Sequence, residues 1–394
     1  MRIAIIQYGV LHDRFEALRA GGQETYYAQR YSVDYVAALS ERHDFVGVIG
    51  VLDNEPSESA LSHSLHSVCI PRDSKGGVDS PTVIKQLESW KPDRLILQAP
   101  IRPVLRWALK NNIDTLPLLA DSFEESGLRY RYRAFRLAQL LSNPRIRAVG
   151  NHNIPSCLSL RRIGVPEDKI YPWDWPHELR PENNAVKALS DQPAKLVFVG
   201  SLAQSKGVGD CIRAGKILRD REIPFSMNLI GAGDFTDEAA ALIAELGLGD
   251  QISLAGRQPH DVVVEELKSA TIALAPSHHI YPEGLPMTIY EALATRTPLA
   301  ISDHPMFRLY FAETPAARMA PERSPEQLAD AIATLLTDAN AYGAASAATE
   351  ALWNRVKCDL TWGALIDAWL GEDGASIEKV KHQNLPAILA ELPK

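Results

Sequence analysis

Residues 275–294, Ala275-Pro-Ser-His-His-Ile-Tyr-Pro-Glu-Gly-Leu-Pro-Met-Thr-Ile-Tyr-Glu-Ala-Leu-Ala294, predict a strand end, a loop and a helix start in direct succession. The strand covers the apolar run Ile272–Ala275 and ends where Pro276 and Ser277 interrupt it. The helix is expected to start near Pro286, because the missing N–H of proline removes no hydrogen bond from a first turn. The stretch therefore places a loop between a buried strand and a helix N-terminus.

This loop and helix carry two glutamates, Glu283 and Glu291, eight positions apart. Gly284 lets the backbone approach a ligand, and the helix amides with their positive dipole end suit an anion such as a diphosphate. On a helical wheel Leu285 and Ile289 share the apolar side, whereas Glu291 lies off that side and is expected to meet a ligand. The spacing corresponds to roughly 12 Å at ~1.5 Å per helical residue. At this spacing alone, an ordinary helix with two solvated glutamates is the alternative.

The segment Glu283-Gly-Leu-Pro-Met-Thr-Ile-Tyr-Glu291 resembles the E-x7-E signature of retaining GT-B glycosyltransferases, most closely those of family 4, the glycosyl transferases group 1. The resemblance implies that Glu283 lies near the donor sugar. It implies that Glu291 binds the ribose hydroxyls of a nucleotide sugar. The residues that follow the first glutamate, Gly284, Leu285 and Pro286, would then belong to the donor-binding loop.

Composition limits the class of protein. A chain of 394 residues is too long for one typical hydrophobic core, so two domains of about 200 residues are expected. A formal net charge of -8 gives no support to nucleic-acid binding, which favours a basic field. The cysteines form no C-x-x-C pair, so the sequence indicates neither a zinc ribbon nor a disulfide framework: Cys69, Cys157, Cys211 and Cys358. With no visible signal peptide and no apolar run near ~18 to 20 residues, we expect a cytoplasmic location.

The first half alternates strands with helical patterns, which predicts a parallel sheet. A helix is expected from about Glu24 to Leu39, and strands are expected at Arg2–Gln7, Phe45–Leu52, Arg94–Gln98 and Leu116–Asp121. Between the first strand and the helix lies a loop with Gly21 and Gly22. This pair resembles the family loop that lies under the donor diphosphate and beside the acceptor, and a plain flexible turn is the alternative.

The strand Leu116–Asp121 delivers Asp121, Ser122 and Glu124 to its carboxyl end, where open α/β sheets bind ligands. Many members of the resembled family carry a histidine in this loop, against the donor sugar or the acceptor, and this chain has none there. Asp121 is the nearest polar candidate, so we expect it to contact the donor sugar or to act as the acceptor base. The alternative is an aspartate that caps the next helix.

The segment Arg129 to Arg136 is both basic and aromatic: Arg129, Tyr130, Arg131, Tyr132, Arg133, Phe135 and Arg136. One interpretation is a peripheral contact with the anionic inner face of a membrane, or with a phosphorylated acceptor. The other interpretation, which we favour from the sequence, is a solvated face whose aromatic side chains pack inward.

A domain boundary is expected near residues 177–194, where proline and glutamate become frequent. Ala148–His152 is expected to be the last strand of the first domain, and Ile170–Pro176 the approach to a hinge. The expected organisation is an acceptor-binding domain at 1–180, a nucleotide-sugar-binding domain at 181–355, and C-terminal helices at 356–394 that pack back on the first domain.

The second half starts with the strand Lys195–Gly200 and a loop that leads to Lys206. Members of the resembled family usually show Gly-Arg-Leu and then Lys-Gly in this loop, and both cations hold the diphosphate. Lys206 matches the second cation, with a plain surface lysine as the alternative. Ser201 stands where the arginine would be, and the sequence leaves open whether Arg257, Arg308 or backbone amides compensate.

Two further glycine loops follow predicted strands. Gly231 and Gly233 do not complete a dinucleotide fingerprint, because Thr236 stands at the third glycine position. In the resembled family this loop lies near the nucleotide. Gly256 and Arg257 match the end of a short strand that contacts the base through backbone atoms, and a simple strand end is the alternative.

Together these motifs predict an α/β chain of two Rossmann-like doubly wound domains facing a cleft (GT-B). The resemblance implies a metal-independent, retaining glycosyltransferase of hexosyltransferase type, which moves a sugar from a UDP- or GDP-sugar to a hydroxyl acceptor such as a glycan, glycolipid or small molecule. Lys206 and the helix amides after Glu283 would stabilise the leaving diphosphate. No cofactor, metal or nucleic-acid partner is expected. A non-catalytic nucleotide-sugar binding protein and a GT-B phosphorylase or epimerase stay open as alternatives, and the phosphorylase would need a lysine that holds pyridoxal phosphate.

Overall fold

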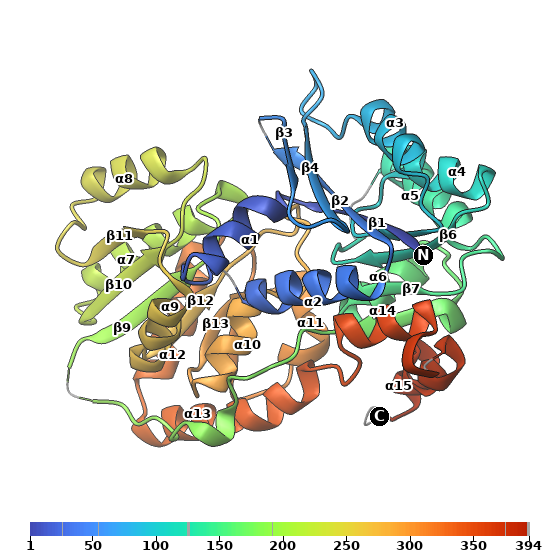
Figure 1. Cartoon of the computed structure of the whole chain (residues 1–394). Helices are drawn as coiled ribbons and strands as arrows, with labels where there is room; N and C mark the ends of the chain where they lie inside the picture. The colour runs from blue at the N-terminus through green and yellow to red at the C-terminus, as the bar shows by residue number, and fades with distance from the viewer. Residues whose placement is uncertain (26, 54, 124–126, 191, 375, 392–394) are drawn as a thin grey trace. The chain divides into compact units, whose positions relative to one another are not determined.

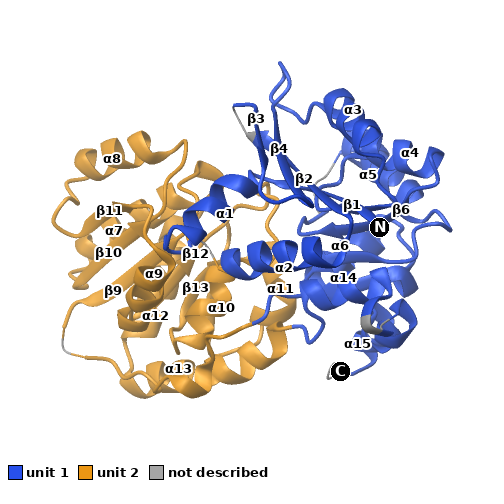
Figure 2. Ribbon diagram, viewed as in Figure 1, with its two compact units in different colours: residues 1–24, 28–176, 358–394 blue, residues 25–27, 177–357 orange. Residues whose placement is uncertain are grey.

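The computed structural model describes residues 1–25, 27–53, 55–123, 127–190, 192–374 and 376–391. The chain divides into two compact units. Unit 1 comprises residues 1–24, 28–176 and 358–394, and unit 2 comprises residues 25–27 and 177–357 (Figure 2). The functional roles expected for the ranges 1–180, 181–355 and 356–394 stay predictions.

The sheet of unit 1 has the strand order β3-β4-β2-β1-β5-β6-β7-β8 (Figure 1). Its strands are β1 Arg2–Tyr8, β2 Phe45–Asp53, β3 Ser57–Ala60, β4 Leu65–Pro71, β5 Arg94–Leu97, β6 Asp114–Leu119, β7 Val149–His152 and β8 Ile170–Trp173. Neighbouring strands pair in parallel, except that β3 runs antiparallel to β4. The strand order reverses between β1 and β5, which makes the carboxyl ends there the expected ligand side of this sheet.

The helices of unit 1 come from both ends of the chain: α1 Leu11–Arg19, α2 Gln29–Arg42, α3 Ser80–Trp90, α4 Arg102–Lys110, α5 Leu128–Leu141, α6 Ile154–Arg162, α14 Trp362–Leu370 and α15 Leu385–Glu391. Short 3₁₀ turns lie at Glu167–Lys169, Glu372–Gly374 and Ile377–Gln383. Helix α14, from the C-terminal part of the chain, shares the core of this unit, where buried Trp362 and Trp369 belong to one cluster with Ile3 and Leu39. Burial of each large apolar side chain contributes about 1.5–3 kcal/mol.

Several expectations for the first half are wrong. Ala148–His152 does not contain the last strand of this unit, because Ile170–Trp173, expected as the approach to a hinge, forms β8 beside β7. Pro172 argued against a strand in the sequence, but β8 is an edge strand. An edge strand tolerates proline because no neighbouring strand needs its N–H. The segment expected as a loop after β1 contains α1, and the helix expected from Glu24 begins at Gln29.

Helix α5 carries the basic and aromatic segment, and the expectation that its aromatic side chains pack inward is wrong for Tyr132 and Phe135. These side chains are 62% and 54% exposed. The buried stripe of α5 is instead Ala134, Leu137, Ala138 and Leu141. Because a helix has 3.6 residues per turn, this stripe leaves the flanking aromatic positions on the outer side.

The sheet of unit 2 has the strand order β11-β10-β9-β12-β13-β14, and its neighbouring strands are parallel (Figure 1). Its strands are β9 Ala194–Val199, β10 Phe225–Ile230, β11 Ile252–Gly256, β12 Ile272–Ala275, β13 Leu299–Ser302 and β14 Ala317–Ala320. The order reverses between β9 and β12, as in a doubly wound sheet. The expected fold class, two Rossmann-like doubly wound α/β domains, is confirmed.

The helices of unit 2 are α7 Val208–Asp220, α8 Thr236–Glu245, α9 His260–Ser269, α10 Met287–Ala294, α11 Pro305–Phe311, α12 Pro325–Leu336 and α13 Ala339–Val356, with 3₁₀ turns at Pro181–Asn183 and Gln204–Lys206. Buried side chains of the sheet, such as Phe198 and Leu274, form one core with Ile212 of α7 and Leu328 of α12. This core holds the sheet and its helices together, and so fixes where the carboxyl ends of the strands lie relative to the N-termini of the helices.

The loops that follow β9, β10 and β11 contact each other through their backbones. The N–H of Gly200 donates to Ile230 O at 3.0 Å, and the N–H of Gly231 donates to Gly256 O at 2.9 Å. Gly231 has a φ of 142°, and a Cβ atom there would lie 1.8 Å from Gly200 O. A Cβ atom at Gly233 would lie 2.3 Å from the carbonyl oxygen of Leu202. Glycine is therefore required at both positions for the loops to approach this closely.

Gly231→Ala is expected to lower the free energy of unfolding more than Gly256→Ala. Both glycines have positive φ, which costs an alanine about 1–2 kcal/mol, but nothing lies within 4 Å of a Cβ atom at Gly256. Only at Gly231 does the new methyl group also meet backbone. Urea denaturation followed by circular dichroism measures both losses. Equal losses would contradict the close approach of these loops.

Candidate functional site

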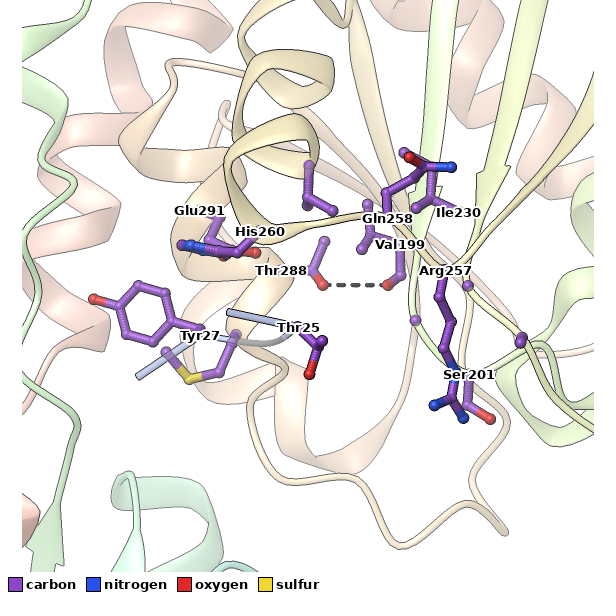
Figure 3. A pocket seen from close by; sticks show the side chains of 15 residues that line it. Thr25, Tyr27, Val199, Ser201, Ile230, Arg257, Gln258, His260, Thr288 and Glu291 are labelled. Carbon is purple, nitrogen blue, oxygen red and sulfur yellow. Dashed lines mark hydrogen bonds and ion pairs between the residues drawn. The ribbon is translucent and has the colours of Figure 1, made fainter. Parts of the chain in front are cut away.

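A pocket of about 390 Å³ opens in unit 2 at the carboxyl ends of β9, β10 and β11 and at the start of α10. Its lining residues are Thr25, Tyr27, Val199, Gly200, Ser201, Ile230, Gly231, Ala232, Arg257, Gln258, His260, Val263, Met287, Thr288 and Glu291 (Figure 3). This is the side of a doubly wound sheet where the strand order reverses and where ligands bind. The loop glycines form part of the wall with backbone alone, so the chemistry of the pocket comes from the side chains around them.

Glu291 lies at one end of this pocket. The residue is only 4% exposed, and its Oε1 accepts a hydrogen bond of 2.6 Å from Nε2 of His260. His260 is the first residue of α9, and the ring of Tyr27 packs against the imidazole at a centroid distance of 5.7 Å. A buried carboxylate held by a ring N–H keeps a fixed orientation, and within the described residues its Oε2 has no hydrogen bond. That oxygen is available to ligand hydroxyl groups.

The start of α10 is fixed against the sheet by Thr288. Its hydroxyl donates to the carbonyl oxygen of Val199 at 3.2 Å, which ties the first turn of the helix to the end of β9 (Figure 3). Pro286 is the residue before the helix, so α10 begins one position later than expected. Between Glu283 and Glu291 only the part from Met287 onward is helical, so a helical rise does not describe the whole segment, and the span of roughly 12 Å stays a prediction.

Lys206 and Glu283 form an ion pair outside the residues that line the pocket. The distance from Nζ to Oε2 is 2.5 Å, and the side chains are 12% and 8% exposed. Ser277 Oγ donates to the same carboxylate oxygen at 2.7 Å, and the Lys206 ammonium lies 4.4 Å from the centroid of the Tyr281 ring. Lys206 is therefore not a solvated surface lysine, and the carboxylate is held by two donors.

Backbone contacts hold this pair in place. Gly207 has a φ of 74°, and a Cβ atom there would lie 2.2 Å from the carbonyl oxygen of Pro276. The N–H of His278 donates to Ser205 O at 2.8 Å, and its ring Nε2 lies 2.7 Å from Asp210 Oδ2. The loop after β9 and the loop after β12 therefore hold each other, which brings Lys206 to Glu283.

Two more histidines brace the loop that carries Glu283. Nε2 of His304 donates to Tyr281 O at 3.1 Å, and its Nδ1 accepts from the N–H of Met306. Burial lowers the pKa of His304, which favours the neutral imidazole that these two bonds require. His279 lies 2.8 Å from Asp303. Within the described ranges, His, Cys, Asp and Glu side chains form no group of three or more that could hold a metal ion.

In unit 1, Asp121 follows β6 at the carboxyl edge of the sheet. Burial raises its pKa to about 6, and its Oδ2 has no hydrogen-bond partner among the described residues. Its charge adds to burial in raising the pKa of Tyr8, at the end of β1. The alternative role as a helix cap is excluded, because the residue before α5 is Gly127. Asp121 is a carboxylate that can take up a proton near neutral pH.

Gly21 and Gly22 terminate α1. Gly21 has a φ of 84°, and the N–H of Gly22 donates to Ala17 O at 2.9 Å, as at many helix C-termini. This structural task is independent of the predicted contact with a donor, which stays a prediction. Glu124, expected near Asp121 and Ser122, lies outside the described residues.

The pocket brings together only some of the predicted donor-binding residues: Gly231, Arg257 and Glu291. The others are not among its lining residues: Gly21, Gly22, Gly233, Gly256, Gly284, Leu285 and Pro286. Sequence analysis missed Tyr27, His260 and Thr288. The position of His260, three residues after Arg257 at a strand end, could have indicated it, whereas nothing near Tyr27 in the sequence points to a site in unit 2.

Comparison with known proteins relates this chain to glycosyltransferases. Residues 180–351 match the family model for glycosyl transferases group 1. The chain is 29% identical to the amylovoran biosynthesis glycosyltransferase AmsK of Erwinia amylovora over 170 residues. This alignment covers 42% of each protein. It is 31% identical to the 2-deoxystreptamine glucosyltransferase of Streptomyces kanamyceticus over 103 residues, and this alignment covers 26% of each protein. These matches span less than half the length of the curated relatives.

Solved structures extend the similarity to the whole chain. Anabaena HepE in complex with UDP and glucose has a TM-score of 0.65 at 12% identity, over 100% of both chains. Sucrose-phosphate synthase from Thermosynechococcus elongatus has a TM-score of 0.64 at 16% identity, over 94% of this chain and 98% of that one. At such identities the similarity shows the fold, which is that of GT-B glycosyltransferases. The resemblance to GT-B glycosyltransferases of group 1 is therefore confirmed, and the match to the family model lies in residues 180–351.

Proposed function

We propose that this chain is a retaining glycosyltransferase that takes a sugar from a nucleoside-diphosphate sugar and transfers it to a hydroxyl acceptor. The buried carboxylate of Glu291 carries the proposal, because it is held by His260 and lines a pocket at the switch point of unit 2. Solved structures of the similar Anabaena HepE contain UDP, UDP-glucose, or UDP and glucose, which supports a donor of the same class.

The donor would lie across the pocket with its ribose at Glu291. A carboxylate with one oxygen held by His260 can accept hydrogen bonds from vicinal hydroxyl groups through its other oxygen. The N–H of Ile289 donates to Pro286 O at 2.9 Å, but a helix start leaves its first amides, here those of Met287 and Thr288, without a partner inside the helix. Together with the positive dipole end, these amides favour the diphosphate. The backbone atoms of Gly256 and Arg257 would contact the base, and Glu283 with the neighbouring loop would orient the sugar.

In the proposed reaction the protein stabilises the departing diphosphate and supplies no nucleophile of its own. The acceptor oxygen would attack the anomeric carbon on the face from which the diphosphate departs, and the bond between that carbon and the phosphate oxygen would break. Lys206 would stabilise the charge that develops on the leaving phosphate. The acceptor proton would pass to Asp121 or to the departing phosphate. We expect this charge stabilisation to work without a metal ion or a cofactor.

A non-catalytic nucleotide-sugar binding protein is the second candidate. Ser201 supports it, because one expected cation is missing from the loop that holds the diphosphate. Binding without transfer or hydrolysis would favour this candidate. A phosphorylase would instead show the absorbance of pyridoxal phosphate in the purified protein.

We propose an anionic membrane surface as a second partner, which the exposed side of α5 would contact peripherally. Leu128, Tyr132 and Phe135 are exposed beside exposed Arg129 and Arg131. Exposed aromatic and apolar side chains can insert at the headgroup level while arginines meet anionic lipids, each worth about 1 kcal/mol near the surface. None of the helices in the described parts of the chain has the length and apolarity that crossing a bilayer requires.

Glu291→Ala is expected to abolish binding of nucleoside diphosphates, since it removes the ribose acceptor, whereas Lys206→Ala is expected to lower turnover more than binding. Calorimetry with UDP-, GDP- and other nucleotide sugars measures binding, and a hydrolysis assay measures turnover. Glu245→Ala, at an exposed position of α8, is the control and should leave both unchanged. Wild-type donor binding in Glu291→Ala would contradict the proposed site.

The rate of transfer is expected to fall as the pH drops through about 6, because the carboxyl group of Asp121, with its pKa raised to about 6, must be ionised to accept a proton. In Asp121→Asn the rate should be low and this inflection absent. The variant should be no less stable at pH 7, because the raised folded-state pKa of Asp121 means that stability is lost as the pH rises from 3.8 to about 6, and the asparagine avoids this loss. Full activity of Asp121→Asn would rule out a base.

The protein is expected to sediment with vesicles only when they contain an anionic lipid. The double variant Tyr132→Ser/Phe135→Ser should bind these vesicles more weakly, because it removes the side chains that would insert. Val262→Ser, a change at an exposed apolar position of unit 2, is the control. Sedimentation that is independent of lipid charge, or unchanged in the double variant, would end the membrane proposal.

A further inference from the structure

The diphosphate of the proposed donor lacks one cation that the resembled family supplies from the end of β9. Ser201 stands at that position, and Lys206 is already paired with Glu283. We propose that Arg257, at the end of β11, supplies the missing charge and binds the diphosphate with its guanidinium group. This proposal rests on the proposed function, and it assigns the Arg257 side chain to the phosphates and not to the base.

Val199 and Gly256 pair with Ile230 from the two sides of β10, so Ser201 and Arg257 lie just beyond the ends of β9 and β11. Gly200 bonds to the end of β10 through Ile230, and Gly231 bonds to Gly256. Two strand spacings of about 4.8 Å separate the two residues, a distance that a long arginine side chain largely spans. The residues that follow β10 between them are Gly231 and Ala232, which have no side chain or a small one.

The pocket agrees with this path. Arg257 and Ser201 both line it. In Figure 3 they lie at one end of the pocket, well away from Glu291 at the other end, and the Arg257 side chain extends in the direction of Ser201. If the ribose binds at Glu291, the diphosphate attached to it would therefore extend toward the end of the pocket where the guanidinium group lies.

In the part of the chain that the structure describes, no acidic side chain forms an ion pair with Arg257. Among the described residues that line the pocket, it is the only lysine or arginine. It has no hydrogen bond or ion pair to another described residue, in contrast to Arg296, which is paired with Glu350. A guanidinium group offers a fixed fork of donors that binds phosphate oxygens in pairs, so an uncommitted one in a pocket is suited to a diphosphate.

Arg308, the other arginine that the sequence offered, is committed elsewhere. Its Nε donates to Asp303 O at 3.1 Å, and a terminal nitrogen lies 3.2 Å from the carboxylate of the same residue. It does not line the pocket. Arg308→Ala therefore removes an equal charge from unit 2 without removing a phosphate contact, which makes it the matched control.

The test is calorimetric titration with UDP and with uridine, and in parallel with GDP and guanosine, at two salt concentrations. Arg257→Ala is expected to weaken binding of the nucleoside diphosphate by ~10- to 100-fold, the effect of losing a charge-assisted contact, and to make it less sensitive to salt. Binding of the nucleoside should not change. The double variant Ser201→Arg/Arg257→Ala should regain most of the lost affinity, because it returns the cation to the end of β9.

The outcomes separate this proposal from the proposed function. If the wild type binds a nucleoside diphosphate and Arg257→Ala binds it equally well, or loses the nucleoside to the same degree, the role of Arg257 is wrong while the donor site stands. Equal losses in Arg257→Ala and Arg308→Ala would show only a general effect of charge and would also overturn it. If the wild type binds no nucleoside diphosphate, the proposed function fails, and this inference fails with it.

Discussion

The close backbone contact between the loops after β9, β10 and β11 is the constraint on which the pocket depends. A side chain at Gly231 would meet the carbonyl oxygen of Gly200, so three strand ends come together with backbone alone. The core of unit 2 sets the level at which these ends meet the start of α10. Because one wall carries so few side chains, the polar groups that can meet a ligand come from the surrounding positions, above all from Arg257 and Glu291.

Several of the charged groups assigned to the donor are held before any ligand binds. His260 orients Glu291, and both Lys206 and Ser277 hold Glu283. Donor binding would therefore exchange partners among fixed groups, with little loss of side-chain freedom, which is how preorganised sites favour charge development. Lys206 would share its ammonium group between Glu283 and the leaving phosphate.

The sequence predicted most where the signal is local. The apolar run Ile272–Ala275 is β12 with the expected bounds, and the Lys-Gly loop and the E-x7-E segment gave the right elements around Lys206 and Glu291. It predicted less where tertiary contacts decide. Pro172 argued against the edge strand β8. The exposed side of α5 depends on the buried residues, from Ala134 to Leu141, that pack on the core. The contacts of Glu291 with His260, and of His260 with Tyr27, join positions far apart in the chain, and no local pattern announces such contacts.

The central claim is that a nucleotide sugar binds in the unit 2 pocket with its ribose at Glu291 and its diphosphate toward Arg257 and the start of α10. A crystal structure with UDP or GDP, whichever binds more tightly, tests this most directly. The account predicts ribose hydroxyl groups within hydrogen-bond distance of the Glu291 carboxylate and phosphate oxygens within hydrogen-bond distance of the Arg257 guanidinium group. A nucleotide bound in the opposite direction, or bound outside this pocket, would contradict it.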